Sequence, residues 1–302
     1  MENNCYFVCS RGLLKSCSFH SPKPISSCKT DTTYLFSMLK SNRMFNGMSI
    51  YVCSDLLRFF VNQILPYLSN TFVLVSGDSD LCVPKEALSK EETLILLNSN
   101  MLLKWFTQNS RIEENDKIIQ MPIGLDYHTI ATNPNCRWRL PEEGTLPKQQ
   151  ENILLNIINV SKPFYDRNHK IYVNFTFNSD RFGQRQLALK TIPDNLMEIK
   201  NDFIPRTKTW QNMINYTFVL SPTGIGLDCH RTWEALCLGC IPIICIKEFK
   251  TMFEDLPILI VNDWNQITKE LLENTIEKFK NKNFKKDKLT LEYWVKQINY
   301  IS

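Results

Sequence analysis

Several features that define common protein classes are absent or scarce in this chain of 302 residues. No apolar stretch is long enough to cross a bilayer, and the first four residues carry no basic charge. We therefore expect neither a signal peptide nor a membrane anchor, and a cytoplasmic location. The net charge is only +4, from 35 basic and 31 acidic residues, so the composition does not indicate a nucleic-acid partner.

Two well-known motifs are incomplete. The Gly-x-Gly-x-x-Gly fingerprint of dinucleotide-binding domains does not occur, which argues against a nicotinamide-dependent oxidoreductase. The C-x-x-C match at Cys237–Cys240 has no second pair to complete a zinc site, and it lies in an apolar setting. The eleven cysteines are an odd number and are scattered, which is typical of free thiols in a reducing compartment.

The chain instead alternates short apolar runs with amphipathic segments. The first clear unit is a strand at 50–53, a helix at 55–68 and a strand at 71–75. Strand–helix–strand alternation predicts a right-handed crossover and a parallel sheet, so we expect an α/β fold. The segment 133–147 is rich in Pro, Asn and Glu, and we place a domain boundary there, which gives domains 1–150 and 151–302.

The same patterns predict the remaining elements. We expect further strands at 101–106, 117–124, 170–177, 218–220, 241–246 and 256–261, and helices at 149–160, 210–216, 228–238, 266–280 and 289–300. A further helix, which carries Arg185, is expected after the polar loop 178–183. No element can be assigned to the first thirty residues.

The most informative stretch runs from Phe218 to Ile246. A buried strand breaks at a Ser-Pro turn with two glycines, Gly224 and Gly226, and a helix follows with Asp228 as its predicted N-cap. Gly239 ends that helix. Since free amides and the positive end of the dipole lie at a helix N-terminus, this turn suits a phosphate group, and the glycines would let the backbone approach an anion.

The first turn of this helix also carries two basic side chains, His230 and Arg231. The helix dipole disfavours cations at this end, and a bound polyanion would explain them. Glu234 lies one turn further on and could accept hydrogen bonds from sugar hydroxyls. Phosphate and hydroxyl recognition together suggest a nucleotide. The alternative is a plain surface ion pair between Arg231 and Glu234 beside a tight turn.

The pattern Ser-Pro-x-Gly-x-Gly-x-Asp-x-His-Arg-x-Trp-Glu-Ala-Leu-x-x-Gly-x-Ile-Pro-Ile, from Ser221 to Ile243, resembles the signature of exostosin-like glycosyltransferases. These are the family-47 type, with bacterial and large-DNA-virus members. The resemblance implies the GT-B architecture, two Rossmann-like domains facing a central cleft, and a UDP-sugar donor bound without a metal. It also implies a phosphate-binding arginine, for which Arg185 is the first choice and Arg181 the second. Many relatives are Golgi membrane proteins, and this chain departs from that pattern.

Asp78 and Asp80 follow the strand at 71–75, at the sheet edge where α/β proteins bind ligands. They could be turn formers, an Asp-x-Asp metal site, or the source of a catalytic base. The resemblance favours Asp80 as the base, with Asp78 second. Asp126 and His128 are the next acid/base candidates, although His128 could also be a loop histidine bonded to backbone.

The resemblance thus implies an inverting, metal-independent glycosyltransferase. It would move a sugar such as xylose, glucuronic acid or galactose from a UDP-sugar to a hydroxyl of a glycan or glycoprotein. The donor-binding residues expected are Arg185, Arg181, Ser221, Gly224, Gly226, Asp228, His230, Arg231 and Glu234. The alternatives are an inactive nucleotide-sugar binder or scaffold, and a metal-dependent transferase that uses Asp78 and Asp80.

Overall fold

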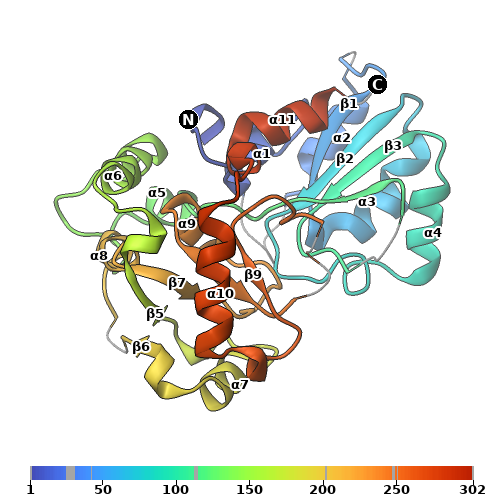
Figure 1. Cartoon of the computed structure of the whole chain (residues 1–302). Helices are drawn as coiled ribbons and strands as arrows, with labels where there is room; N and C mark the ends of the chain where they lie inside the picture. The colour runs from blue at the N-terminus through green and yellow to red at the C-terminus, as the bar shows by residue number, and fades with distance from the viewer. Residues whose placement is uncertain are drawn as a thin grey trace.

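The computed structural model describes residues 2–24, 31–41, 43–111, 115–200, 203–246, 249 and 251–300. It is a mixed α/β structure with one four-stranded and one five-stranded sheet, and every strand pair in both is parallel. The two sheets occupy different ends of the molecule (Figure 1). We call the part around the four-stranded sheet the first half and the part around the five-stranded sheet the second half. The α/β fold and the parallel sheets expected from the sequence are confirmed.

The first sheet has its strands in chain order, β1-β2-β3-β4. Its strands are β1 (Met48–Cys53), β2 (Phe72–Gly77), β3 (Leu102–Thr107) and β4 (Ile118–Gln120). Both faces are covered, because alternate strand residues belong to two different apolar clusters. Helices α3 (Leu57–Gln63) and α4 (Lys90–Asn98) cover one face, and α1 (Ser10–Lys15) lies on the opposite side of the sheet.

The second sheet has the order β6-β5-β7-β8-β9. Its strands are β5 (Asn168–Val173), β6 (Met197–Ile199), β7 (Tyr216–Leu220), β8 (Ile241–Ile244) and β9 (Leu259–Ile260). Helices α7 (Gln184–Thr191) and α10 (Lys269–Lys280) pack on one face, and α8 (Arg206–Met213) and α9 (His230–Cys237) on the other.

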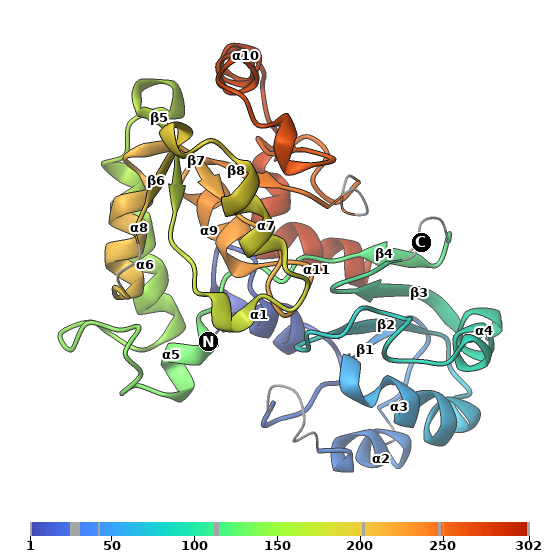
Figure 2. The same cartoon turned by 90° about the horizontal axis from the view of Figure 1, so that it is seen from below.

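This order creates a crevice between β5 and β7. The chain leaves β5 toward α7 on one face and leaves β7 toward α9 on the other face. Two neighbouring strands whose following segments diverge in this way leave a gap at their carboxyl ends, which is where open α/β sheets bind ligands. The loops after β5 and β7 face the first sheet across this gap (Figure 2).

The chain crosses between the two halves more than once. Helix α6 (Pro147–Asn159) leads into the second half, while α11 (Leu291–Asn299) returns to the first. The sequence places the C-terminal helices in the second domain, 151–302, but α11 packs against α1 (Figure 1), and Ser49 of β1 donates to the side chain of Asn299. Helix α2 (Thr33–Leu39) and the short α5 (His128–Thr132) complete the set of α-helices in the described residues.

Some predicted boundaries were wrong. The helix expected at 55–68 is broken into α3 and two short 3-10 turns, one on each side of it. Pro66 accounts for the break after α3, because proline cannot continue an α-helix. Tyr216 opens β7 instead of ending a helix. The strand expected at 256–261 is reduced to β9. Helices α1, α2, α4 and α5 and strand β6 were not predicted. None of the helices within the described residues has the length and apolar character needed to span a membrane.

Candidate functional site

A cavity of about 630 Å³ opens at the carboxyl ends of β5, β6 and β7 and is bounded on the other side by loops of the first half. Nine of the residues singled out from the sequence line it: Asp80, Asp126, Arg185, Gly224, Gly226, Asp228, His230, Arg231 and Glu234. The sequence therefore located most of one continuous site, although several of these side chains have roles other than the expected ones.

Two guanidiniums lie close to one aromatic ring. The Cζ atoms of Arg185 and Arg231 lie 5.5 and 5.4 Å from the ring centre of Phe175, in the loop after β5. Arg185 donates to the carbonyl of Thr176 and to the hydroxyl of Ser179 at 2.8 Å. Within the described residues, no carboxylate lies within 4.0 Å of either guanidinium.

Electrostatics sets this pair apart from ordinary buried arginines. Arg185 is buried and Arg231 is partly buried. Burial, and then the charge of Arg185, lower the pKa of Arg231 below its usual value. Buried charges are normally paired, because removing an ion from water is costly. Two neighbouring cations that make hydrogen bonds only to neutral groups in the described part of the chain suit an anion with two charges.

The glycines of the loop make room for side chains. A Cβ atom on Gly224 would lie 2.7 Å from Nη2 of Arg185. One on Gly226 would lie 3.0 Å from Oδ1 of Asp80 and 3.1 Å from Nδ2 of Asn109. The two glycines therefore allow the loop to touch Arg185 on one side and the first half on the other.

Most amides of this loop already have protein partners. Oδ1 of Asn109, which follows β3, accepts from the amides of Leu227 at 3.0 Å and Asp228 at 2.9 Å. The amide of Gly224 donates within the loop, and that of Cys229 to the Asp228 carboxylate. These four amides are thus not available for a phosphate, and the guanidiniums carry the charge of the site.

Asp228 is not the helix N-cap, which was a wrong prediction. Helix α9 begins at His230, its N-cap is Cys229, and no side chain caps it. The carboxylate of Asp228 is buried and accepts from the amide of Ile123 at 2.8 Å and from Nε1 of Trp233. Burial raises its pKa to about 6, despite these hydrogen bonds. Asp228 thus joins the glycine loop to the first half.

Glu234 lies on the cavity wall with its carboxylate largely free. Its nearest cation is Arg206 of α8, with Nε 3.9 Å from Oε1. No hydrogen bond to the Glu234 carboxylate is formed within the described part of the chain. The carboxylate can therefore accept hydrogen bonds from ligand hydroxyls.

Asp126 and His128 are differently placed. Asp126 is buried and bound by Arg206, with Nη2 2.9 Å from Oδ2. Burial alone would raise the pKa of Asp126, but Arg206, His230 and His128 together hold it below its usual range. His128 is absent from the cavity lining, and burial lowers its pKa to about 4 although Asp126 lies beside it. Neither group has the properties of a base that faces the cavity.

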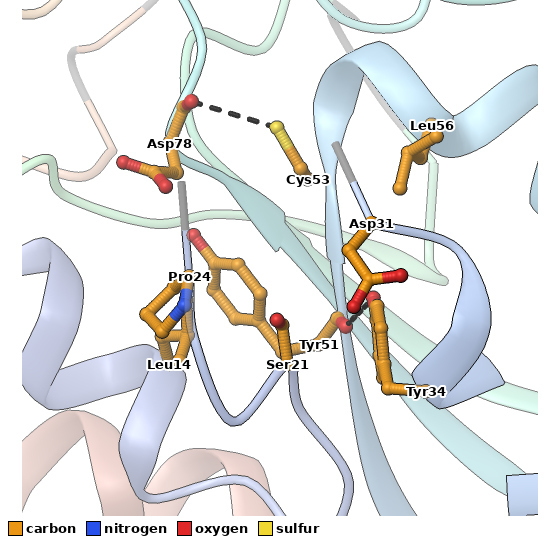
Figure 3. A pocket seen from close by; sticks show the side chains of 9 residues that line it. All are labelled: Leu14, Ser21, Pro24, Asp31, Tyr34, Tyr51, Cys53, Leu56 and Asp78. Atoms are coloured by element: carbon orange, nitrogen blue, oxygen red, sulfur yellow. Dashed lines mark hydrogen bonds between the residues drawn. The ribbon is translucent and has the colours of Figure 1, made fainter. Parts of the chain in front are cut away.

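Asp78 and Asp80 point to different places. Asp78 has a left-handed backbone with φ of 57°, and its carboxylate lies 3.1 Å from Nη2 of Arg11. It lines a separate small pocket of about 20 Å³ beside Tyr51 (Figure 3). Asp80 lines the large cavity, is exposed, and has its pKa raised by loss of hydration, with His230 opposing the shift.

The two carboxylates therefore do not converge on one point. No group of three or more His, Cys, Asp or Glu side chains suited to a metal ion occurs among the residues that the structure describes.

Two other expected donor ligands lie outside the lining. Arg181 forms an ion pair with Glu86 of the first half, with Nη2 2.7 Å from Oε1. The hydroxyl of Ser221 is buried and bonded to the hydroxyl of Thr232 at 2.8 Å. Arg181 thus forms a partly exposed ion pair between the two halves, and the hydroxyl of Ser221 ties the loop to α9.

The structure adds lining residues that the sequence did not reveal. Arg206 contacts the ring of Trp138, with Cζ 5.6 Å from the ring centre, and Arg137 lies 4.0 Å over Phe203. These four residues form one aromatic and basic end of the cavity. Arg206 is the first residue of α8, so the rule that singled out Arg231, a cation in a first helical turn, could have found it.

Comparisons with known proteins give no relative: no protein-family model matches the chain, and no curated protein is significantly similar to it.

Proposed function

We propose that this protein is a glycosyltransferase that binds a UDP-sugar in the cavity between its two halves. The observation that carries the proposal is the pair Arg185 and Arg231 at the crevice between β5 and β7, two guanidiniums that form no ion pair with any carboxylate the structure describes. A diphosphate supplies the two negative charges that this pair lacks, and arginine binds phosphate oxygens with two parallel hydrogen bonds.

The rest of the cavity suits the other parts of a nucleotide sugar. The carboxylate of Glu234, which accepts no hydrogen bond from the described residues, is an acceptor for ribose or sugar hydroxyls. Phe203 follows β6, two strands along the sheet from β7, which is roughly 10 Å at the usual strand spacing. Phe203 and Trp138 offer flat apolar surfaces for a base at this end of the cavity.

The chemistry would follow from the same charges. Negative charge develops on the diphosphate as the bond to the sugar breaks, and fixed guanidiniums stabilise it there. The acceptor would enter from the first half, where Asp80 faces the cavity. Two parallel-sheet halves around a cleft are compatible with a GT-B architecture, and the motif from Ser221 to Ile243 supports an exostosin-like enzyme that inverts the anomeric centre.

The metal-dependent alternative has less support. An Asp-x-Asp site needs both carboxylates on one ion. The carboxylate of Asp78 is instead paired with Arg11, and Asp78 lines a different pocket from Asp80. An inactive binder remains the second candidate, since it would share the donor site and differ only in turnover.

The test is a titration of the protein with UDP, UMP and uridine by calorimetry, with and without a chelator. We expect UDP to bind at least ten-fold more tightly than uridine, and equally well with chelator. UDP-glucose, UDP-galactose, UDP-xylose and UDP-glucuronic acid are then incubated with the protein, and UDP release is followed. UDP no tighter than uridine would refute the donor site. Tight binding without release of UDP from any sugar would favour the inactive binder.

A further inference from the structure

The side chain of His230 is fixed at one ring nitrogen and open at the other. Nδ1 lies 2.7 Å from the carbonyl oxygen of Gly124, in the loop after β4. A carbonyl only accepts, so Nδ1 carries the proton in the neutral ring and Nε2 keeps its lone pair. In the described part of the chain, Nε2 forms no hydrogen bond, and the residue lines the cavity.

His230 and Arg231 point in different directions from the start of α9. Arg231 donates to the carbonyl of Asn174 after β5, in the second half, whereas His230 bonds to Gly124 in the first half. Consecutive helical residues are about 100° apart around the axis, so adjacent side chains of one turn can point to different parts of the cavity. The diphosphate side of the cavity is next to Arg231, and the acceptor side is next to His230.

We propose that His230 is the general base that deprotonates the acceptor; this assignment rests on the proposed function. The acceptor hydroxyl gives its proton to Nε2 as its oxygen forms a bond to the anomeric carbon. The bond from that carbon to the diphosphate oxygen breaks, and its electron pair leaves with UDP. The imidazolium, still donating to the Gly124 carbonyl, then returns its proton to water.

Asp80 is the main competitor, and its surroundings favour a supporting role. Against the larger effect of burial, which raises the pKa of Asp80, the nearby amide of Gly226 lowers it and so favours the charged form. Asp80 interacts electrostatically with His230, so it can stabilise the charged ring that the reaction creates. This arrangement resembles other enzymes in which a histidine takes the proton and a carboxylate stabilises the resulting cation.

Other titratable groups also face His230. Asp126 and His128 lie on the first half, with the two histidine rings 6.4 Å apart, and Asp228 lies just before α9. With Asp80 these are the groups whose ionisation would be felt at His230. A pH profile alone would therefore not assign the base, and the experiment below compares variants.

The test uses the full chain with the variants His230→Asn and His230→Ala. The Asn amide can still donate to the Gly124 carbonyl but offers no basic nitrogen at the Nε2 position. We measure UDP binding and UDP release from the UDP-sugar panel, in which water is the acceptor. For His230→Asn we expect wild-type UDP affinity, release slowed about 100-fold or more, and loss of the acid limb of the pH–rate profile. For His230→Ala we expect rescue by added imidazole.

Other results with these variants would overturn the assignment of His230 as the base. Wild-type release rates in His230→Asn would overturn the base assignment and leave the donor site intact. Loss of UDP affinity in His230→Asn, as in Arg231→Ala, would make His230 a donor ligand and also overturn it. Asp80→Asn should reduce release by a smaller factor than His230→Asn, and the reverse order would make Asp80 the base. If wild-type protein does not bind UDP, the proposed function itself fails, which these variants do not test.

Discussion

The carboxylate of Asp228 accepts a hydrogen bond from the main-chain amide of Ile123, 2.8 Å away and 105 residues earlier in the chain. The same carboxylate binds Nε1 of Trp233 and the amide of Cys229, so three donors converge on it. The glycine loop thus depends on a buried carboxyl group for its position against the first half.

Asp228 should make stability depend on pH. Its pKa is raised by burial from 3.8 to about 6, so the folded state binds a proton more tightly than the unfolded state. This contribution is fully present below about pH 4 and is lost as the pH rises through about 6. The shift corresponds to a change of about 3 kcal/mol in the free energy of unfolding between low and high pH.

Urea unfolding from pH 4 to 7 tests this dependence. Asp228→Asn should be less stable than wild type at pH 4, because one of the three donors meets an amide N–H group, and the difference should shrink toward pH 7. The control is Asp116→Asn at an exposed site. A constant difference across this range would contradict the raised pKa.

The ion pair between Asp126 and Arg206 should stabilise the contact between the halves. The two side chains are 5% and 9% exposed, and removing one partner strands the other charge. Asp126→Asn or Arg206→Met should each cost about 3–5 kcal/mol, and the double variant less than the sum. Because the pKa of Asp126 is held low, the contribution persists at neutral pH and is lost only as the pH falls below the usual aspartate range.

A double-mutant cycle in urea at pH 7 measures this coupling directly. The ion pair Lys269–Glu273, exposed on α10, is the matched control and should show a coupling below about 1 kcal/mol. Additive effects of Asp126→Asn and Arg206→Met would show that the buried pair has no net interaction.

The two glycines should respond differently to alanine. The Cβ of Gly224→Ala would displace the guanidinium of Arg185, which is bonded to Ser179 and Thr176, so UDP affinity should fall at least ten-fold. Gly226→Ala presses on Asp80 and Asn109 by only a few tenths of an ångström and should mainly lower stability, by about 1 kcal/mol.

Ile225→Ala is the matched control, because Ile225 lies between the glycines and is 46% exposed. Calorimetric titration with UDP and thermal unfolding of the three variants separate the two effects. Equal loss of affinity in all three would show that the loop acts as a unit and that the approach of Arg185 is not the reason for Gly224.

The sequence located the site for two reasons. Apolar runs predict where the strands end, and ligand residues of α/β proteins follow the carboxyl ends of strands. Asp80, Arg185 and Arg231 were found in this way, after β2, β5 and β7. What the side chains do there depends on partners far away in the chain. The side chain of Asn109 accepts hydrogen bonds from amides that were predicted to bind phosphate. No local sequence pattern indicates a hydrogen bond between residues 118 positions apart.

The divergence of Asp78 and Asp80 shows the same limit. The two carboxylates are two positions apart and would share a face in an extended strand. The left-handed backbone at Asp78 turns the chain, and its partner Arg11 belongs to the segment where the sequence predicted no element. The sequence alone therefore could not decide whether the two carboxylates bind one metal ion or point in different directions. The position of Arg11 decides this.

The close approach of Arg185 and Arg231 should lower the stability of the ligand-free protein. Arg231 carries a charge in a buried setting next to Arg185, and burial lowers its pKa. Arg231→Met keeps the apolar length of the side chain against Phe175 and removes the charge. We expect the variant to be as stable as wild type without ligand, or more stable by about 1 kcal/mol, and to lose UDP binding.

Thermal unfolding with and without 1 mM UDP measures both effects at once. UDP should raise the melting temperature of wild type, because a ligand that binds only the folded state stabilises it, and should leave Arg231→Met unchanged. Arg181→Met is the matched control: its partner is Glu86, so it should lose stability and keep the response to UDP. A destabilised Arg231→Met that still responds to UDP would show that Arg231 serves the fold and not the anion.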